Sequence, residues 1–385
     1  MALSYKAEEY MVSLGIDIGT TSISMVLVDV EARTVISSKT IPNDSFLSNK
    51  KAWEKQQDPN RIIEIVLCAI EELKSDRERI SYIGLTGQMH GILYLNAKGE
   101  AVSPLYTWQD GAGDQLYRDG QTYAAHLQQI TGVHMAAGFG GTTYYAHHMQ
   151  EQVPSEAVSF CTIGDYLGMK LTGRETPLLD ITKASSLGLF DLRRHVFMND
   201  EITRAGLSLK MFPKVSAKRQ ILGCWKDKVP VGMALGDNQA SFMGAVENRE
   251  QTVLVNIGTG SQIAFLLDHY EELPEMELRP FTENQYLAVV SGLCGGRAYA
   301  ILADFYEKII SAFHPTVGRN EIYAWMEDLI KNYKEKEPQL IVAPLFNGTR
   351  TEPHLRGEIT GIDTENLDPA DMTYGMLKGI STELY

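Results

Sequence analysis

Two short turns rich in glycine and threonine restrict the fold of this chain more than any other feature. One turn occupies residues 19–22 and the other residues 258–261, so each half of the chain contains one. Each turn follows an apolar run and precedes a second run rich in β-branched and apolar residues, which is the composition of strands. We therefore expect two hairpins, each made of a strand, a turn and a strand.

Both turns have the groups that bind an anion. A glycine lets a ligand approach the backbone closely, and hydroxyl and N–H donors point at one place. The residues that would do so are Gly19, Thr20, Thr21 and Ser22 in the first turn and Gly258, Thr259 and Gly260 in the second. A Walker loop is excluded because the chain has no Gly-x4-Gly-Lys-Ser/Thr string. A dinucleotide fingerprint is excluded because Ile263 replaces its third glycine.

Two aspartates lie close to these turns. Asp17 lies between Ile16 and Ile18 in a strand that should be buried, where an unpaired carboxylate costs several kcal/mol. It should therefore contact a cation or hydrogen-bond donors, and both a water-held magnesium ion and a neighbouring backbone amide would satisfy this need. Asp237 lies in a glycine-flanked loop before the second hairpin. Two anion-binding hairpins with an acidic loop between them predict an ATP-dependent phosphotransferase.

Length and charge narrow the class of protein. A chain of 385 residues suits two domains, and 44% hydrophobic residues suffice for two cores. No apolar run reaches the length of a membrane span, and residues 1–10 lack the pattern of a signal peptide. The net charge of −14 argues against nucleic acids and anionic membranes as partners. The four cysteines have no paired spacing, and we expect a cytoplasmic protein.

The two halves continue in the same way after their hairpins. In the first half we expect a strand near residues 34–40, a helix capped by Asp58 and Pro59, and a strand at residues 82–86. In the second half we expect a strand at residues 286–290 and a helix at about residues 299–312. This alternation predicts an α/β fold with two domains, at residues 11–245 and 252–385, that face a shared cleft.

Five motifs together resemble the FGGY family of carbohydrate kinases: residues 15–22, 87–91, 107–110, 236–239 and 256–260. The likeness extends through residues 346–353 and so spans nearly the whole chain. It implies an actin-like, ribonuclease-H-like fold in both domains around a central cleft. It also implies that ATP and Mg²⁺ bind between the domains and that a ketose or polyol binds deep in the cleft.

The resemblance also implies roles for particular residues. Asp237 is similar to the family's catalytic base, which takes the proton from the sugar's terminal hydroxyl as that hydroxyl attacks the γ-phosphate. The alternative is an ordinary turn aspartate. The residues that would contact or cover the sugar are Gln88, Met89, His90, Asn238, Trp108 and Asp110. A core histidine and a half-buried aromatic remain the alternatives at His90 and Trp108. The two turns would hold the nucleotide, and Asp17 would hold the metal.

Within the family, the likeness is strongest to kinases of sedoheptulose, with kinases of xylulose next. We therefore expect phosphorylation of a ketose, with sedoheptulose 7-phosphate as the product and xylulose as the alternative substrate. Gly138, Gly140 and Gly141 predict a roomy cleft, because glycines leave space that larger side chains would fill. A nucleotide-clamped scaffold of the actin or chaperone type and a catalytically silent sugar-binding relative stay open as alternatives, as does a homodimer.

The chain departs from the family pattern in two places. The family has an arginine soon after the aspartate at position 110, whereas this chain has Gly111, Ala112 and Gly113. Family members also continue past a helix like residues 369–384 into a glycine-rich segment that packs against adenine. Because this chain ends at Tyr385, we expect an incomplete second domain, weak ATP binding and slow turnover.

Overall fold

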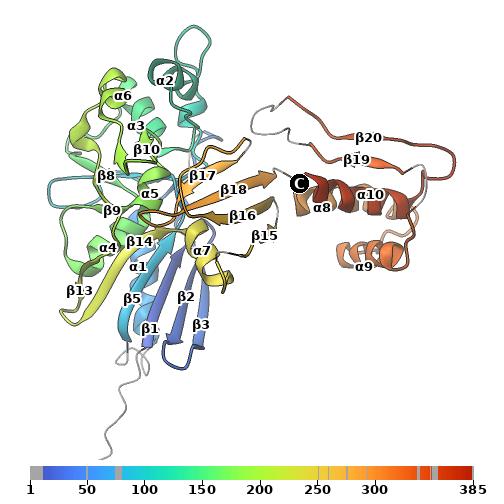
Figure 1. The fold of residues 1–385 in the computed structure, drawn as a ribbon, viewed down its shortest axis with the longest axis horizontal. Coiled ribbons are helices and arrows are strands. Elements are labelled where there is room, and N and C mark those ends of the chain that lie inside the picture. The colour runs from blue at the N-terminus through green and yellow to red at the C-terminus, as the bar shows by residue number, and fades with distance from the viewer. Residues whose placement is uncertain are drawn as a thin grey trace, which may run out of the picture. The chain divides into compact units, whose positions relative to one another are not determined.

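The structure is a computed structural model that describes residues 12–48, 51–73, 80–249, 251–258, 260–274, 276–292, 294–335, 339–346, 348 and 354–383. The chain forms two compact units (Figure 1). Unit 1 runs to Gly244 and also includes Asp268–Tyr270 and Arg279–Tyr286. Unit 2 begins at Ala245 and includes the other described residues.

A six-stranded sheet forms the centre of unit 1, with the strand order β13-β14-β5-β1-β2-β3. Its strands are β1 (Val12–Ile18), β2 (Ser22–Asp29), β3 (Thr34–Pro42), β5 (Ile80–Gly87), β13 (Ile221–Trp225) and β14 (Val229–Gly236). Strand β5 is parallel to both β1 and β14, whereas the other neighbours are antiparallel. The sheet therefore has three parallel strands at its centre, and their carboxyl ends share one edge.

The first glycine-threonine turn joins β1 to β2 as an antiparallel hairpin, with Ile18 opposite Ile23. This confirms the predicted order of strand, turn and strand. A Cβ atom on Gly19 would lie 2.8 Å from the carbonyl oxygen of Ser22, so the turn requires glycine at this position. Strand β1 buries every second side chain, including Ile16 and Ile18, and this alternation places Asp17 on the opposite face of the sheet.

Helix α4 (Ile163–Thr172) packs against β5, β13 and β14, and helix α1 (Pro59–Glu72) packs against α4. The apolar residues of α1 recur at helical spacing and are buried: Ile62, Ile63, Val66, Ala69 and Ile70. Asp58 caps α1 as predicted, because its side chain accepts hydrogen bonds from the amides of Asn60 and Arg61.

Shorter elements surround the sheet of unit 1. The strands are β4 (Gln56–Gln57), β6 (Leu93–Leu95), β7 (Leu105–Tyr106), β8 (Ser159–Cys161), β9 (Leu178–Asp180), β10 (Phe190–Asp191), β11 (Val196–Phe197) and β12 (Lys214–Ser216). The helices are η2 (Ala112–Asp114), α2 (Tyr123–Thr131), α3 (Gly140–Met149), α5 (Ile181–Ser185), α6 (Asn199–Arg204), η3 (Leu209–Met211) and α7 (Asp237–Ala245).

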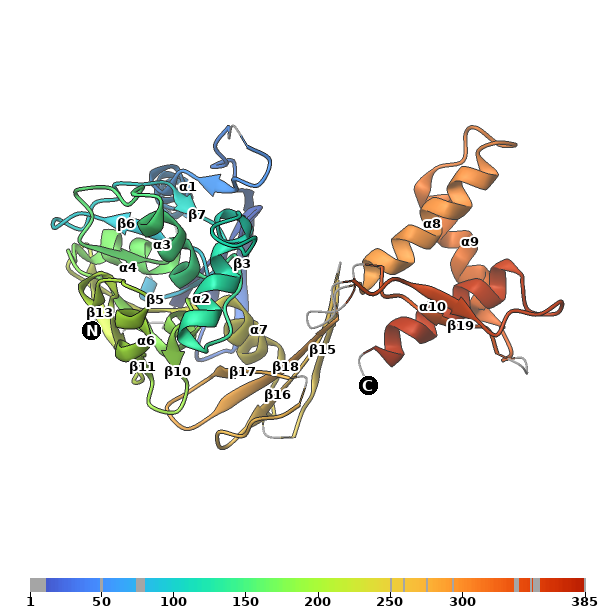
Figure 2. The same ribbon diagram turned by 90° about the horizontal axis from the view of Figure 1, so that it is seen from above.

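Unit 2 begins with the second hairpin, in which β15 (Leu254–Ile257) pairs antiparallel with β16 (Ser261–Leu267). A four-stranded sheet has the order β15-β16-β18-β17, with β17 at Glu277–Pro280 and β18 at Tyr286–Gly292. The remaining elements are α8 (Gly296–Ile310), α9 (Arg319–Lys331), β19 (Ile341–Ala343), β20 (Glu358–Thr360) and α10 (Pro369–Thr382). Figure 2 labels α8, α9, β19 and α10, and Figure 1 labels β20.

The core of unit 2 lies between α8, α9, α10 and β19 and includes Leu302, Tyr306, Met326 and Met376. Helix α8 begins three residues before the predicted start at residue 299. The reason is that its first turn contains Gly296, which has a low helix propensity and conceals the beginning of the helical pattern.

Candidate active site

Three parallel strands of unit 1 end side by side and bring distant parts of the sequence together. The register pairs Ile18 of β1 with Gly87 of β5, and Gly87 with Gly236 of β14. Three predicted site residues directly precede or follow these paired positions: Asp17, Gln88 and Asp237. The topology therefore gathers the candidate metal ligand, the candidate sugar contacts and the candidate base at one edge of the sheet.

Asp237 is the first residue of α7 and is half-buried. Its Oδ1 atom accepts a hydrogen bond of 2.7 Å from the backbone amide of Asn238, which is also half-buried. The position just before it is fixed, because the amide of Gly236 donates to Thr182 Oγ1 at 2.9 Å. The carboxylate thus projects from a well-defined strand-to-helix junction.

One carboxylate oxygen of Asp17 is buried. Its Oδ1 atom is shielded from solvent and has no hydrogen-bond partner in the described part of the chain. Burial raises the pKa of Asp17, and the negative charge of Asp237 raises it further, whereas the ammonium group of Lys183 lowers it. Asp17 also lines a cavity of about 630 Å³ within unit 1, together with Thr86 and Leu235. An unsatisfied carboxylate oxygen beside a cavity is suited to bind a cation.

The loop formed by Gln88, Met89 and His90, called loop 88–90 below, follows β5. Gln88 is buried, its amide donates to the carbonyl of Ile18 at 2.8 Å, and its Nε2 donates to Gln57 Oε1 at 2.9 Å. Met89 is buried as well, and its sulfur lies so close to Gly236 that a Cβ atom there would be 2.8 Å from it. Gln88 and Met89 therefore hold the loop in place, and a direct sugar contact of either side chain stays a prediction.

His90 has the left-handed backbone conformation, with φ of 69°. Its amide donates to Ser186 Oγ at 3.0 Å, and its Nδ1 lies 2.7 Å from the carbonyl oxygen of Ser186. Because a carbonyl oxygen only accepts, Nδ1 carries the hydrogen, and in the neutral ring Nε2 is then an acceptor. The ring also stacks on Phe139, with centroids 5.0 Å apart. This orientation suits Nε2 to accept a hydrogen bond from a hydroxyl group.

Thr20 connects the first turn to loop 88–90 and to Trp108. Its Oγ1 accepts a hydrogen bond of 3.0 Å from Trp108 Nε1 and lies 3.5 Å from Gln88 Oε1. Gln57 donates to the carbonyl of Thr20 at 2.8 Å, and Asn43 donates to that of Gly19 at 2.9 Å. The turn predicted to hold a nucleotide and the loop predicted to hold a sugar are thus parts of one hydrogen-bonded network.

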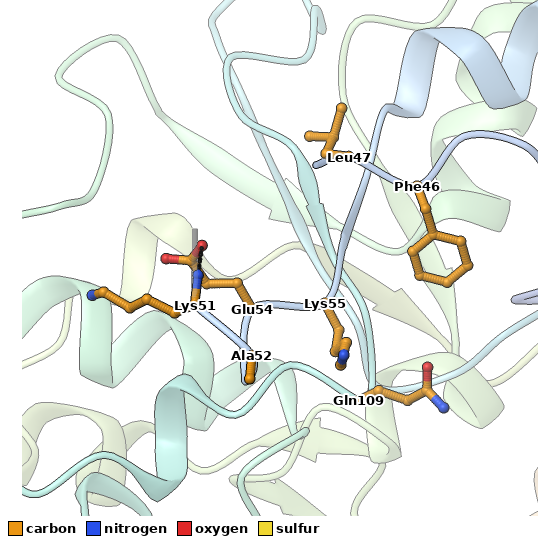
Figure 3. A pocket seen from close by; sticks show the side chains of 7 residues that line it. All are labelled: Phe46, Leu47, Lys51, Ala52, Glu54, Lys55 and Gln109. Carbon is orange, nitrogen blue, oxygen red and sulfur yellow. Dashed lines mark hydrogen bonds between the residues drawn. The ribbon is translucent and has the colours of Figure 1, made fainter. Parts of the chain in front are cut away.

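Asp110 and Trp108 have different surroundings. The carboxylate of Asp110 is buried and accepts hydrogen bonds from the amides of Lys55 at 2.9 Å and Ala112 at 3.0 Å, so it ties its own loop to the segment that contains Lys55. The side chain of Trp108 is exposed. The next residue, Gln109, lines an open groove of about 570 Å³ (Figure 3), together with Phe46, Leu47, Lys51, Ala52, Glu54 and Lys55. Sugar contact stays a prediction for both residues.

The expectation that three glycines widen a cleft is wrong. A Cβ atom on Gly138 would lie 2.0 Å from the carbonyl oxygen of Trp108, and one on Gly140 would lie 2.4 Å from a methyl group of Ile92. A Cβ atom on Gly141 would lie 2.8 Å from the carbonyl oxygen of Leu187. These glycines let segments pack closely and leave no extra room for a ligand.

Several residues of the network carry no motif in the sequence. Gln57 is fully buried and makes hydrogen bonds there. In the sequence, the only feature that could indicate this role is its position directly before the helix cap Asp58, since a buried polar side chain needs a hydrogen-bond partner. Three further residues, Thr182 and Lys183 on α5 and Ser186 directly after it, contact the end of β14, the end of β5 and loop 88–90, respectively, across large separations in the sequence. Only the fold places them at the site.

The second turn lies at the start of α8 in unit 2. The amide of Gly258 donates to the carbonyl of Gly260 at 2.8 Å, and the amide of Gly296 donates to that of Gly258 at 2.7 Å. The amino end of a 15-residue helix therefore lies against this turn, and such ends attract anions. Thr259 lies outside the described residues.

Two kinds of feature are not found among the described residues. Among them, no three or more histidine, cysteine, aspartate or glutamate side chains are grouped so that they could hold a metal ion. A helix with the length and apolar character needed to cross a bilayer is also not found in the described part of the chain.

Known proteins resemble this chain in sequence and in fold. The N-terminal domain of the FGGY family of carbohydrate kinases matches residues 12–244. Sedoheptulokinase of Mus musculus is 26% identical over 418 residues, covering 97% of this chain and 85% of that protein, and the human sedoheptulokinase is 24% identical over 416 residues, with the same coverage. The xylulose kinase from Rhodospirillum rubrum has a similar structure, with a TM-score of 0.81 and 20% identity, covering 96% of this chain and 77% of that chain.

These comparisons confirm the predicted α/β fold, in which the sheet and helices match those of actin-like kinase domains. The expectation that an adenine-binding segment is missing stays a prediction. Because the family's N-terminal domain matches residues 12–244 of the 385, this protein belongs to the FGGY family of carbohydrate kinases.

Proposed function

We propose that this chain transfers the γ-phosphate of ATP to the terminal hydroxyl of a ketose, with sedoheptulose as the first candidate. The observation that carries the proposal is the register of β1, β5 and β14. It sets an aspartate at the start of a helix, a loop with an oriented histidine and a threonine-glycine turn at one edge of a single sheet. A sugar kinase needs a base, groups that bind hydroxyls and groups that bind phosphate, and this edge offers all three.

In this proposal Asp237 acts as the general base. A neutral hydroxyl is a poor nucleophile, and phosphoryl transfer otherwise depends on positioning and on charge neutralisation. Asp237 is half-buried and directly follows Gly236, the last residue of β14, which packs against Met89 of loop 88–90. His90 Nε2, an acceptor in the tautomer that Ser186 selects, would accept a hydrogen bond from another hydroxyl of the sugar.

In this proposal the first turn, in unit 1, offers backbone N–H groups and hydroxyls to phosphate, and in unit 2 the amino end of α8 beside the second turn would attract an anion. A protein with a net charge of −14 repels a nucleotide at long range, so these local donors must supply the attraction. Mg²⁺ would neutralise part of the phosphate charge. Asp17 fits such an ion because its buried Oδ1 has no partner in the described residues.

The choice of ketose rests on the relatives. Two similar proteins are named sedoheptulokinase, at 26% and 24% identity, which supports sedoheptulose. Solved structures of similar fold are xylulose kinases, at 20% identity, which supports xylulose as the second candidate. The close packing around Gly138 and Gly140 removes the argument from a roomy cleft. A cytoplasmic location and the possibility of a homodimer stay predictions.

The proposal is tested by ADP release from purified protein with ATP and Mg²⁺, with and without sedoheptulose or xylulose. A sugar kinase should release ADP only when a ketose is present. Release without any sugar would indicate a scaffold ATPase instead. Calorimetric binding of a ketose with no release of ADP would indicate a catalytically silent sugar-binding relative.

A further inference from the structure

A fully buried lysine lies behind the candidate active site. Lys183 is on α5, and none of its surface is exposed. Lysine is almost never fully buried without partners, because its ammonium group loses its hydration. No role in binding substrate is open to this side chain, since solvent and ligands do not reach it.

The partners of Lys183 are backbone carbonyl groups of the candidate sugar loop. Its Nζ atom donates to the carbonyl of Gly87 and, at 2.9 Å, to that of Gln88. On its other side, the peptide of Gln88 is held by β1, because its amide donates to the carbonyl of Ile18 at 2.8 Å. The backbone at the start of loop 88–90 is therefore fixed from two directions.

The other end of the loop is held from the same helix. Ser186 follows α5 directly, and its Oγ accepts from the amide of His90 at 3.0 Å while its carbonyl accepts from His90 Nδ1 at 2.7 Å. The same hydroxyl donates to the carbonyl of Lys183 at 2.7 Å. Lys183 and Ser186 thus form one support for both ends of loop 88–90.

Carboxylates surround this lysine from four elements. Burial lowers the pKa of Lys183, and this is opposed by the negative charges of Asp237, Asp165, Asp17 and Asp180. Two of these carboxylates, Asp237 and Asp17, are the candidate base and the candidate metal ligand. These carboxylates therefore offset part of the cost of burying the ammonium group of Lys183.

We infer that Lys183, with Ser186, is a positioning residue that holds loop 88–90 in the conformation that binds the ketose. The inference rests on the proposed sugar kinase function. Lys183 contacts the backbone that precedes His90, whereas no hydrogen bond joins it to the two nucleotide turns in the described residues. Its loss should therefore weaken ketose binding much more than nucleotide binding.

The test is Lys183→Met, which keeps most of the side-chain length but removes the charge and the donors. We expect the ketose KM to rise on the order of tenfold, because a small displacement of a positioning group has a large kinetic effect. The ATP KM should change by less than about twofold. Lys170→Met is the matched control, because Lys170 also donates to a backbone carbonyl, that of Gly99 at 3.1 Å, but lies on the exposed surface of α4. Its constants should equal those of the wild type.

Ser186→Ala provides a second test, which decides the matter if Lys183→Met does not fold. It removes only the hydroxyl at the far end of the loop, and it should also raise the ketose KM and not the ATP KM. A fall in kcat with both KM values unchanged, or an equal rise in both KM values, would overturn the inference. If the wild type releases no ADP with any ketose, the proposed function fails, and ketose binding by calorimetry to both variants still tests the support of the loop.

Discussion

At the scale of single residues, two carboxylates of the site have different surroundings. Asp237 is half-buried at a strand-to-helix junction, and the amide of Asn238 donates to it. Asp17 is in the sheet, with one oxygen that lacks a partner among the described residues. A base must meet the substrate, whereas a metal ligand must keep its charge near the phosphates. Each aspartate therefore leads to a separate prediction.

Asp237→Asn should abolish most turnover and leave the fold and the ketose affinity intact. Asparagine preserves the shape of the side chain but cannot take a proton. We expect kcat to fall by on the order of two to four decades. Steady-state kinetics and ketose binding by calorimetry measure the two effects separately, and near-normal turnover in a folded variant would show that another group is the base.

Asp17→Asn should raise the concentration of Mg²⁺ needed for half-maximal activity. The variant removes a negative charge beside the proposed ion and leaves Asp237 in place. A magnesium titration at saturating ATP and ketose measures this requirement. An unchanged titration would assign Asp17 a structural role.

Asp165 predicts a pH dependence of stability. It is fully buried on α4, where Thr162 Oγ1 donates to it at 2.7 Å, and burial raises its pKa from the usual 3.8 to about 7. Because the folded pKa lies above the unfolded one, the folded state binds the extra proton between these values. The stability from this group is full below pH 3.8 and is lost as the pH rises to about 7.

Asp165→Asn should therefore flatten the dependence of the unfolding free energy on pH between about pH 4 and 7. Urea unfolding of the variant and the wild type at several pH values, followed by circular dichroism, gives the two slopes. Asp114→Asn, which removes a less buried carboxylate on η2, is a suitable comparison. Equal slopes for Asp165→Asn and the wild type would show that Asp165 is ionised in the folded protein.

At the scale of elements, local signals in the sequence predict the long and regular parts. The apolar alternation around residues 12–29 predicts the first hairpin, and Asp58, Pro59 and the spacing of isoleucines predict α1. Helix α5 has no such signal, because five residues are too few for a period. Lys183 of α5 and Ser186 directly after it position loop 88–90 through hydrogen bonds to residues almost a hundred positions away. A local sequence pattern gives no information about such contacts.

The helix caps allow a paired prediction. Asp58 caps α1 in unit 1 and Asp368 caps α10 in unit 2, and in both helices a proline follows the cap. Asp58→Ala and Asp368→Ala should each cost about 1 kcal/mol of helix stability. Hydrogen exchange followed by mass spectrometry should show faster exchange only in α1 for the first variant and only in α10 for the second. Each variant is the control for the other, and equal exchange in both helices would contradict local capping.

At the scale of the whole molecule, the sequence predicts the residues that face the candidate site better than the buried residues that hold them in position. The motifs that contain Asp17, loop 88–90 and Asp237 each follow or end a strand, and the parallel register brings them together. The prediction that the glycines at positions 138, 140 and 141 widen a cleft is wrong, because a sequence does not show whether a glycine adjoins a cavity or a closely packed segment. Gln57 and Lys183 could not be predicted because a buried polar residue is defined by its partners.

The preference for one ketose over another depends on the complete substrate site. If the likeness to sedoheptulokinases extends to specificity, sedoheptulose should have a kcat/KM at least equal to that of xylulose. A coupled assay of ADP release with five-, six- and seven-carbon ketoses, at fixed ATP and Mg²⁺, gives these kcat/KM values. Asp237→Asn serves as the blank for each sugar, since it should bind the ketose without phosphorylating it. A clear preference for xylulose would assign the chain to the second candidate and would leave the role of Asp237 unchanged.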